Sequence, residues 1–153
     1  MKKIIEKLFR NEKGSYAIIA VIMIPIFLLI AALAVDMSIL FAARAELLKA
    51  SDIAAIEVSK YIKLKISEDT GEVIVKPGYV SYAYEWVKLN FVNRFGGTLK
   101  EVGVRFELDN DEINPEIVYV KSVANIPLYF AKIIGMKSTN VGVEGSARIR
   151  EVK

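Results

Sequence analysis

The sequence contains no cysteine and no histidine in its 153 residues. Without cysteine there is no disulfide, so any folded part is held together by its apolar core and hydrogen bonds. Without histidine, the commonest general base and the commonest zinc ligand are both missing. A serine–lysine dyad is not formed by Lys121 and Ser122, because adjacent side chains of an expected strand point to opposite faces. We therefore expect no enzyme, no cofactor and no metal site.

Net charge is also nearly absent beyond the N-terminus. The formal charge is +3, and the residues before Gly14 account for it, because five of them are basic and two are acidic. The rest of the chain carries as many basic as acidic residues. A nucleic-acid surface is therefore not expected. The basic tail is instead typical of the cytoplasmic flank of a membrane span.

A long uncharged run follows this tail, from Gly14 to Val35. The first charged residue after the run is Asp36. About 20 apolar residues at ~1.5 Å each cross a ~30 Å hydrocarbon core. The run predicts one anchor in the cytoplasmic (inner) membrane, with the N-terminus inside and the C-terminal part outside. The alternative is a cleaved secretory signal, because Ala32-Leu33-Ala34 forms a site of the A-x-A type. The length of the run and the unbroken helical pattern beyond it favour the retained anchor.

The helical pattern continues to about residue 64, and Pro25 is the one helix breaker in it, where we expect a kink. Beyond Asp36 the helix becomes amphipathic. Apolar residues then recur at steps of three and four: Leu40, Ala43, Leu47, Ala50, Ala54 and Val58. This stalk face is covered either by neighbouring subunits or by the chain's own head.

The remaining sequence alternates short periodic segments with turns. It predicts a strand at 72–76, a helix over 79–95, strands at 98–109 and 116–124, a short helix at 127–134 and a last strand at 141–152. The polar turn 109–115 lacks the EF-hand spacing, which favours a hairpin turn over a calcium loop. The fold class is therefore α+β, with a long N-terminal membrane-spanning helix and a small head on an antiparallel sheet. The expected divisions are a basic tail (1–14), a spanning helix continued as a stalk (15–64) and an extracytoplasmic head (65–153).

Several short motifs then suggest a family. They are Gly14-Ser15-Tyr16-Ala17, the apolar run with its central proline, Ala34-Val35-Asp36, Ala43-Arg44-Ala45-Glu46-Leu47 and Ala50-Ser51-Asp52-Ile53-Ala54-Ala55. Over about residues 10 to 58 the chain resembles TadE/TadG-like proteins. These are pilin-like components of the tight-adherence (Flp) branch of type IV pilus machines. The resemblance implies a pilin-like structural subunit or minor pseudopilin of such a pilus or its assembly machinery, a role in adhesion, and a compact pilin-like head.

The resemblance also implies partners and a processing site. Membrane lipid and like subunits would contact the N-terminal helix, and a prepilin peptidase would cut between Gly14 and Ser15. Ile19 departs from the pattern, because cut pilins usually carry glutamate there, and in this it resembles the TadG side. No nucleic-acid partner is expected.

Candidate subunit contacts lie on the helix just beyond the span: Asp36, Leu40, Ala43, Arg44, Leu47 and Ala54. In a tight helix bundle Asp36 would be buried and would need a positive partner, such as Arg44 or the free amine of Ser15 on a neighbour. In a lone anchor Asp36 would mark the aqueous boundary. The alternative function is a single-span binding or sensor module, whose head would carry an exposed ligand groove.

Overall fold

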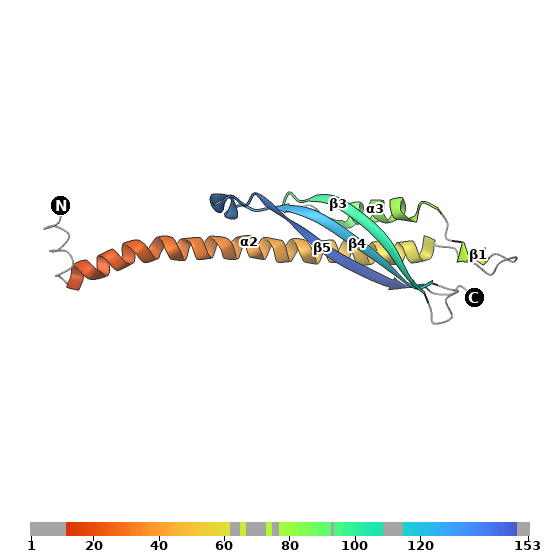
Figure 1. Cartoon of the computed structure of the whole chain (residues 1–153), viewed down its shortest axis with the longest axis horizontal. Helices are drawn as coiled ribbons and strands as arrows, with labels where there is room; N and C mark the ends of the chain where they lie inside the picture. Colours follow the sequence, from red (N-terminus) through yellow and green to blue (C-terminus); the bar gives the residue numbers. More distant parts are fainter. Residues whose placement is uncertain are drawn as a thin grey trace.

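The computed structural model describes residues 12–61, 65–66, 73–74, 77–92, 94–108 and 115–149. One helix, α2 (Glu12–Tyr61), runs through 50 residues. Its first half extends alone, and the rest of the described chain packs along its second half (Figure 1). The protein is therefore an α+β molecule with one long apolar N-terminal helix and a small head with a three-stranded antiparallel sheet. This confirms the fold class expected from the sequence.

Helix α2 stays helical across Pro25 and ends at Tyr61, three residues before the expected end. Nearly all side chains from Tyr16 to Val35 are exposed, although most of them are large and apolar. In the described part of the chain, α2 is the one helix long and apolar enough to cross a membrane. Its length and composition are consistent with membrane anchoring.

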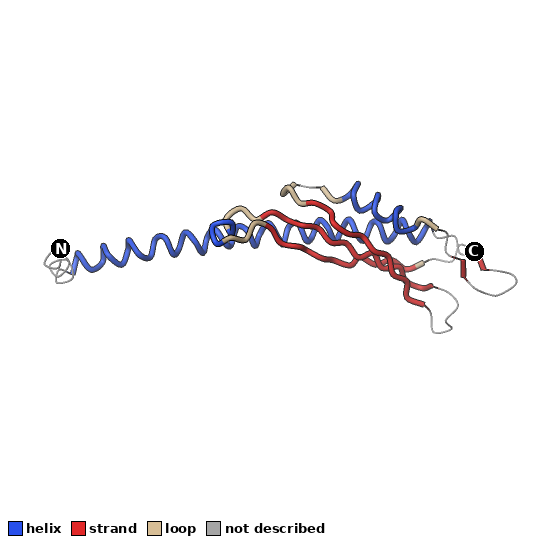
Figure 2. The backbone as a smooth tube through the Cα atoms, turned by 45° about the horizontal axis from the view of Figure 1, so that its top comes forward, coloured by secondary structure: helices blue, strands red, loops and turns tan. Residues whose placement is uncertain are grey.

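The sheet consists of β3 (Thr98–Leu108), β4 (Pro115–Pro127) and β5 (Ser138–Arg148) in that order, with both neighbouring pairs antiparallel. It lies along the second half of α2 (Figure 2). β1 (Lys65–Ile66) and β2 (Val73–Ile74) form a separate two-stranded antiparallel sheet. The short strand expected at 72–76 is thus present in part, paired with Lys65–Ile66, where no strand was expected.

Several expected boundaries were wrong, among them the start of the last strand, which begins at Ser138 and not at 141. Helix α3 (Tyr79–Asn90) ends five residues before the expected end, because Phe91 already has an extended backbone and packs against the core. Strand β4 continues to Pro127, where it pairs with Ser138 of β5. The helix expected at 127–134 is therefore shortened to one 3₁₀ turn, η1 (Ala131–Ile134). The expected turn from 109 to 114 and the end of the last strand beyond 149 lie outside the described residues.

The core lies between the second half of α2, one face of the sheet, and α3. Its largest fully buried side chains include Leu47 and Val58 from α2, Val118 and Val120 from β4, and Val87 from α3. Burying one such side chain contributes about 1.5–3 kcal/mol. Because α2 supplies one wall of this core, the head is completed by the stalk, and without α2 the core face of β4 and β5 would lose its cover.

Candidate functional site: the junction between helix and head

The expected subunit-contact residues occupy two different environments. Ala43, Leu47 and Ala54 are fully buried beneath the chain's own head, and Leu40 is half-buried against the same core. Of the two covers that the sequence allowed for this face, the structure therefore provides the intramolecular one. Arg44 is exposed at the edge of this face of α2. Gly14 and Ser15 lie in the first turns of α2, and their side chains are outside the described set.

Asp36 has partners that the sequence did not indicate. Its side chain is only 3% exposed, and its two carboxylate oxygens accept the backbone N–H groups of three consecutive residues. Tyr129 donates to Oδ1 at 2.9 Å, Phe130 donates to Oδ2 at 3.0 Å and to Oδ1 at 3.3 Å, and Ala131 donates to Oδ2 at 2.7 Å. Within the single chain, these amides replace both the basic partner and the hydrating water expected for Asp36.

These three amides lie at the start of η1, since Phe130 is its N-cap residue and Ala131 its first residue. The first N–H groups of a helical turn lack partners within the turn, and an anionic acceptor there makes strong, charge-assisted bonds. Asp36 therefore caps η1 from another element, 93 to 95 residues earlier in the chain. Sequence periodicity could not have revealed this contact, because the partners are backbone groups in a distant loop.

The segment from Leu128 to Lys137, here called the η1 loop, is closed by its own backbone. Leu128 donates to the carbonyl of Lys137 at 3.0 Å, and Met136 donates to that of Ala131 at 3.0 Å. Gly135 makes the closing turn possible with a φ of +88°, which side-chain-bearing residues rarely adopt. Leu128 and Ala131 are buried, whereas the other side chains of the loop are exposed. The loop is therefore a compact unit fastened to α2 at Asp36.

A second junction joins the middle of α2 to the sheet. The hydroxyls of Ser51 and Ser122 lie 2.9 Å apart, and both side chains are fully buried. Ser51 also donates to the carbonyl of Leu47 at 2.9 Å. Next to them, Ser146 of β5 donates its N–H to the carboxylate of Asp52 at 3.3 Å. The small and polar residues of the Ala50–Ala55 motif thus form the surface of α2 against which the sheet packs.

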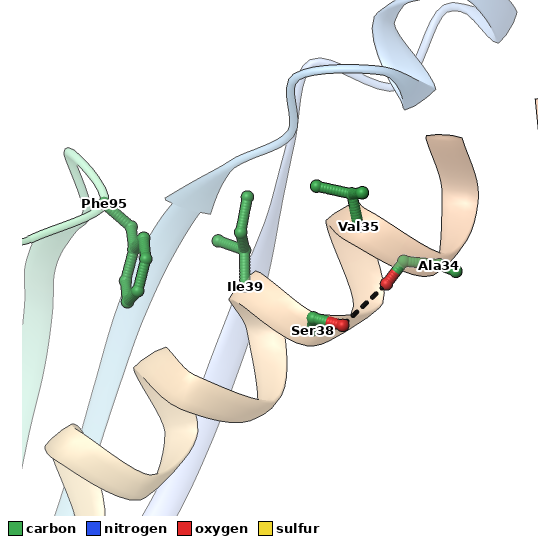
Figure 3. Close-up of a pocket in the computed structure, with 5 residues that line it drawn as sticks. All are labelled: Ala34, Val35, Ser38, Ile39 and Phe95. Carbon is green, nitrogen blue, oxygen red and sulfur yellow. Dashed lines mark hydrogen bonds between the residues drawn. The ribbon is translucent and has the colours of Figure 1, made fainter. Parts of the chain in front are cut away.

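An apolar hollow of about 380 Å³ lies at the end of the head nearest the span. It is lined by Ala34, Val35, Ser38, Ile39 and Phe95. Figure 3 shows the ring of Phe95 facing Ile39, while the Ser38 hydroxyl donates to the Ala34 carbonyl at 2.8 Å. No side chain lining it is charged. The hollow fits an apolar group and offers nothing that would activate a substrate.

The outer face of the sheet is largely polar, and several of its described side chains pair with one another. Arg105 forms an ion pair with Glu144 at 3.2 Å and lies 4.4 Å from the centre of the Tyr119 ring. The Tyr119 hydroxyl donates to Glu107, and this bond raises the pKa of Tyr119. Lys121 is exposed and Ser122 is buried, on opposite faces as expected. Among the described residues no group of three or more acidic side chains gathers to hold a metal ion.

Comparisons with known proteins give no relative: no family model, no curated protein and no solved structure matches the chain.

Proposed function

We propose that the chain is a membrane-anchored, pilin-like structural subunit or minor pseudopilin of a Tad/type IV-like pilus or of its assembly machinery. One observation supports this most strongly. The first half of one continuous helix is apolar and exposed, and its second half packs in the core of a head with a β-sheet. Such a subunit can exchange lipid for the helices of other subunits without altering its head. The motif resemblance over residues 10 to 58 points the same way.

The charge distribution supports an orientation for the proposal. The basic residues before Gly14 favour the cytoplasmic side, and the segment just beyond the apolar run is balanced in charge. The head then lies outside the cytoplasmic membrane, or on an extracellular filament after assembly. A prepilin peptidase cutting between Gly14 and Ser15 would release the mature subunit. Intact-mass measurement of the membrane-extracted protein tests this step, since a first residue other than Ser15 contradicts it.

The structure redirects the proposed subunit contacts on the stalk. Because Ala43, Leu47 and Ala54 are covered internally, a neighbour meets the adjacent, exposed face of α2, where Met37, Phe41 and Leu48 are exposed. These three are separated by four and seven residues, so they share one helix face. They continue the exposed apolar surface of the span, and the exposed Arg44 lies between them. Small residues of the span, such as Ala17, Ala20 and Ala31, allow neighbouring helices to approach closely.

Substitution of Phe41 tests this contact. Phe41 is 64% exposed on α2, and the matched control Leu89 is 73% exposed on α3. We expect Phe41→Glu to abolish self-association of the full chain in the membrane and Leu89→Glu to leave it intact. Because the chain has no cysteine, association can be read from disulfide cross-linking of a single Ala45→Cys on the exposed face.

The cross-linking result also separates the two functional readings. Cross-linked dimers and larger species from Ala45→Cys, lost in Phe41→Glu, support helix-mediated assembly. If the Ala45→Cys chain stays monomeric while Phe41 and Leu89 are unchanged, the structural role is contradicted. That outcome would favour the alternative, a single-span binding or sensor module.

A further inference from the structure

The η1 loop exposes an unusual amount of apolar surface for a segment of the head. Its exposed large apolar residues are Tyr129, Phe130, Ile133, Ile134 and Met136, and Ile133 is 80% exposed. Contiguous exposed apolar side chains in a soluble domain mark a surface that contacts something other than water. Two lysines, Lys132 and Lys137, are exposed among them.

The position of this loop identifies what it contacts. The bonds from Tyr129, Phe130 and Ala131 to Asp36 fix the loop beside the first charge after the apolar run. Figure 1 shows η1 extending past the sheet toward the N-terminal end, alongside α2. The exposed apolar surface of the loop therefore lies beside the end of the apolar run, where the span would leave the hydrocarbon.

The chemistry of the loop matches a membrane interface. Spans are commonly flanked by aromatic residues at both interfaces, and lysines reach from apolar surroundings to the headgroups. On α2, Tyr16 occupies one end of the apolar run, and the other end, at Val35, has no aromatic residue within a turn. Tyr129 and Phe130 supply aromatic rings at that end, and Lys132 Nζ lies 5.8 Å from the centre of the Tyr129 ring.

We infer that the η1 loop is a second membrane contact. It inserts Ile133, Ile134 and their apolar neighbours into the outer interfacial layer of the bilayer that α2 spans, and places Lys132 and Lys137 at the headgroups. The loop, fastened through Asp36, would fix the depth of the helix and the orientation of the head on the membrane. This inference rests on the anchoring part of the proposed function and not on filament assembly.

Lipid quenching of single-cysteine probes tests the inference on the full chain. A fluorophore is attached at Ile133→Cys, at Ile24→Cys in the apolar run or at Val80→Cys, in nanodiscs of phosphatidylcholine and phosphatidylglycerol. Val80 lies in the first turn of α3, where Tyr82 stacks on Tyr61 at the end of α2 farthest from the span. Side chains at all three positions are exposed. With spin-labelled lipid, we expect strong quenching at positions 24 and 133 and none at position 80.

A second measurement removes the objection that the probe itself draws the loop into lipid. A probe at Ser138→Cys, just after the loop, is compared with and without Ile133→Gln and Ile134→Gln. We expect its quenching to fall several-fold in the glutamine variant, because the amide side chains disfavour insertion.

Each other outcome overturns the inference in a distinguishable way. Quenching at position 24 without quenching at 133 leaves the anchor intact and refutes the loop contact. Shielding of position 133 from water only at high protein-to-lipid ratio, without lipid quenching, shows that a second copy covers the loop. The absence of quenching at position 24 refutes the membrane anchor itself, and the loop contact with it.

Discussion

Gly145 of β5 lies directly against the backbone of Ser51 in α2. A Cβ atom at position 145 would stand 2.4 Å from the carbonyl carbon of Ser51 and 2.4 Å from the amide nitrogen of Asp52. Real Cβ atoms essentially never come so close to other heavy atoms. The sheet can therefore cross the helix at this short distance only because position 145 has no side chain. The same approach brings Ser122 within hydrogen-bond distance of Ser51.

Alanine at position 145 should therefore destabilise the head. Because the colliding atoms belong to backbone, the sheet must shift away from α2, and overpacking of this kind costs about 1–3 kcal/mol or more. The matched control is Gly142→Ala in the same strand, whose Cβ would meet only Val123 Cγ2 at 3.9 Å. Chemical unfolding of the full chain in detergent measures both. Equal stability of the two variants would contradict the close crossing.

The paired serines make a separate prediction about the same junction. A hydroxyl has one proton, so Ser51 donates to the Leu47 carbonyl and accepts from Ser122. Removing either hydroxyl alone should cost about 1–3 kcal/mol, because Ser51→Ala leaves Ser122 buried without this partner. The double variant Ser51→Ala, Ser122→Ala should cost less than the sum of the single variants. Simple additivity in this double-mutant cycle would show that the two hydroxyls do not interact.

The periodicity of the sequence was enough to predict the architecture, because the apolar run, the helical repeat and the alternating strands are local signals. Val102, Val104 and Phe106 alternate along the strand expected at 98–109, and all three pack against the core. The end of α3 was missed because Phe91 continues the helical spacing of apolar residues. Its backbone is nevertheless extended, and its side chain packs against the core from that conformation.

The junction could not be predicted in the same way. Whether Leu47 faces a neighbour or its own head depends on where the sheet folds back, and both choices give the same helical pattern. The partners of Asp36 are backbone amides, which every residue has, so no residue type signals them. Gly145 could be read from the sequence, but the need for glycine at this position follows only from the crossing of β5 over Ser51.

Two adjacent leucines distinguish internal core from exposed surface on the stalk. Leu47 has no exposed surface, whereas Leu48, about 100° further around α2, is 40% exposed. Leu47→Ala should lower the free energy of unfolding by about 2–5 kcal/mol, because it leaves a cavity beneath the sheet. Leu48→Ala should change it by less than about 1 kcal/mol. If chemical unfolding of the full chain in detergent shows similar losses for both, the head does not cover Leu47 as described.

The last prediction concerns the attachment of the η1 loop through Asp36. Asp36→Asn keeps the shape of the side chain but replaces one acceptor oxygen with an amide that points N–H groups at the N–H groups of Phe130 or Ala131. The loop should open more often, so exchange of the Tyr129, Phe130 and Ala131 amides should accelerate by about tenfold or more. Hydrogen exchange with mass spectrometry on peptides covering 128–137, in nanodiscs, measures this directly.

The control for this substitution is Asp52→Asn, which alters one carboxylate bond of 3.3 Å, from the N–H of Ser146, on the same helix. It should leave exchange in the η1 loop unchanged, because the two sites are more than four helical turns apart on α2. Exchange of the loop amides that stays slow in Asp36→Asn would mean that the bonds between Leu128 and Lys137 and between Met136 and Ala131 suffice to hold the loop. Asp36 would then be a boundary charge that accepts these amides without fastening the head to the helix.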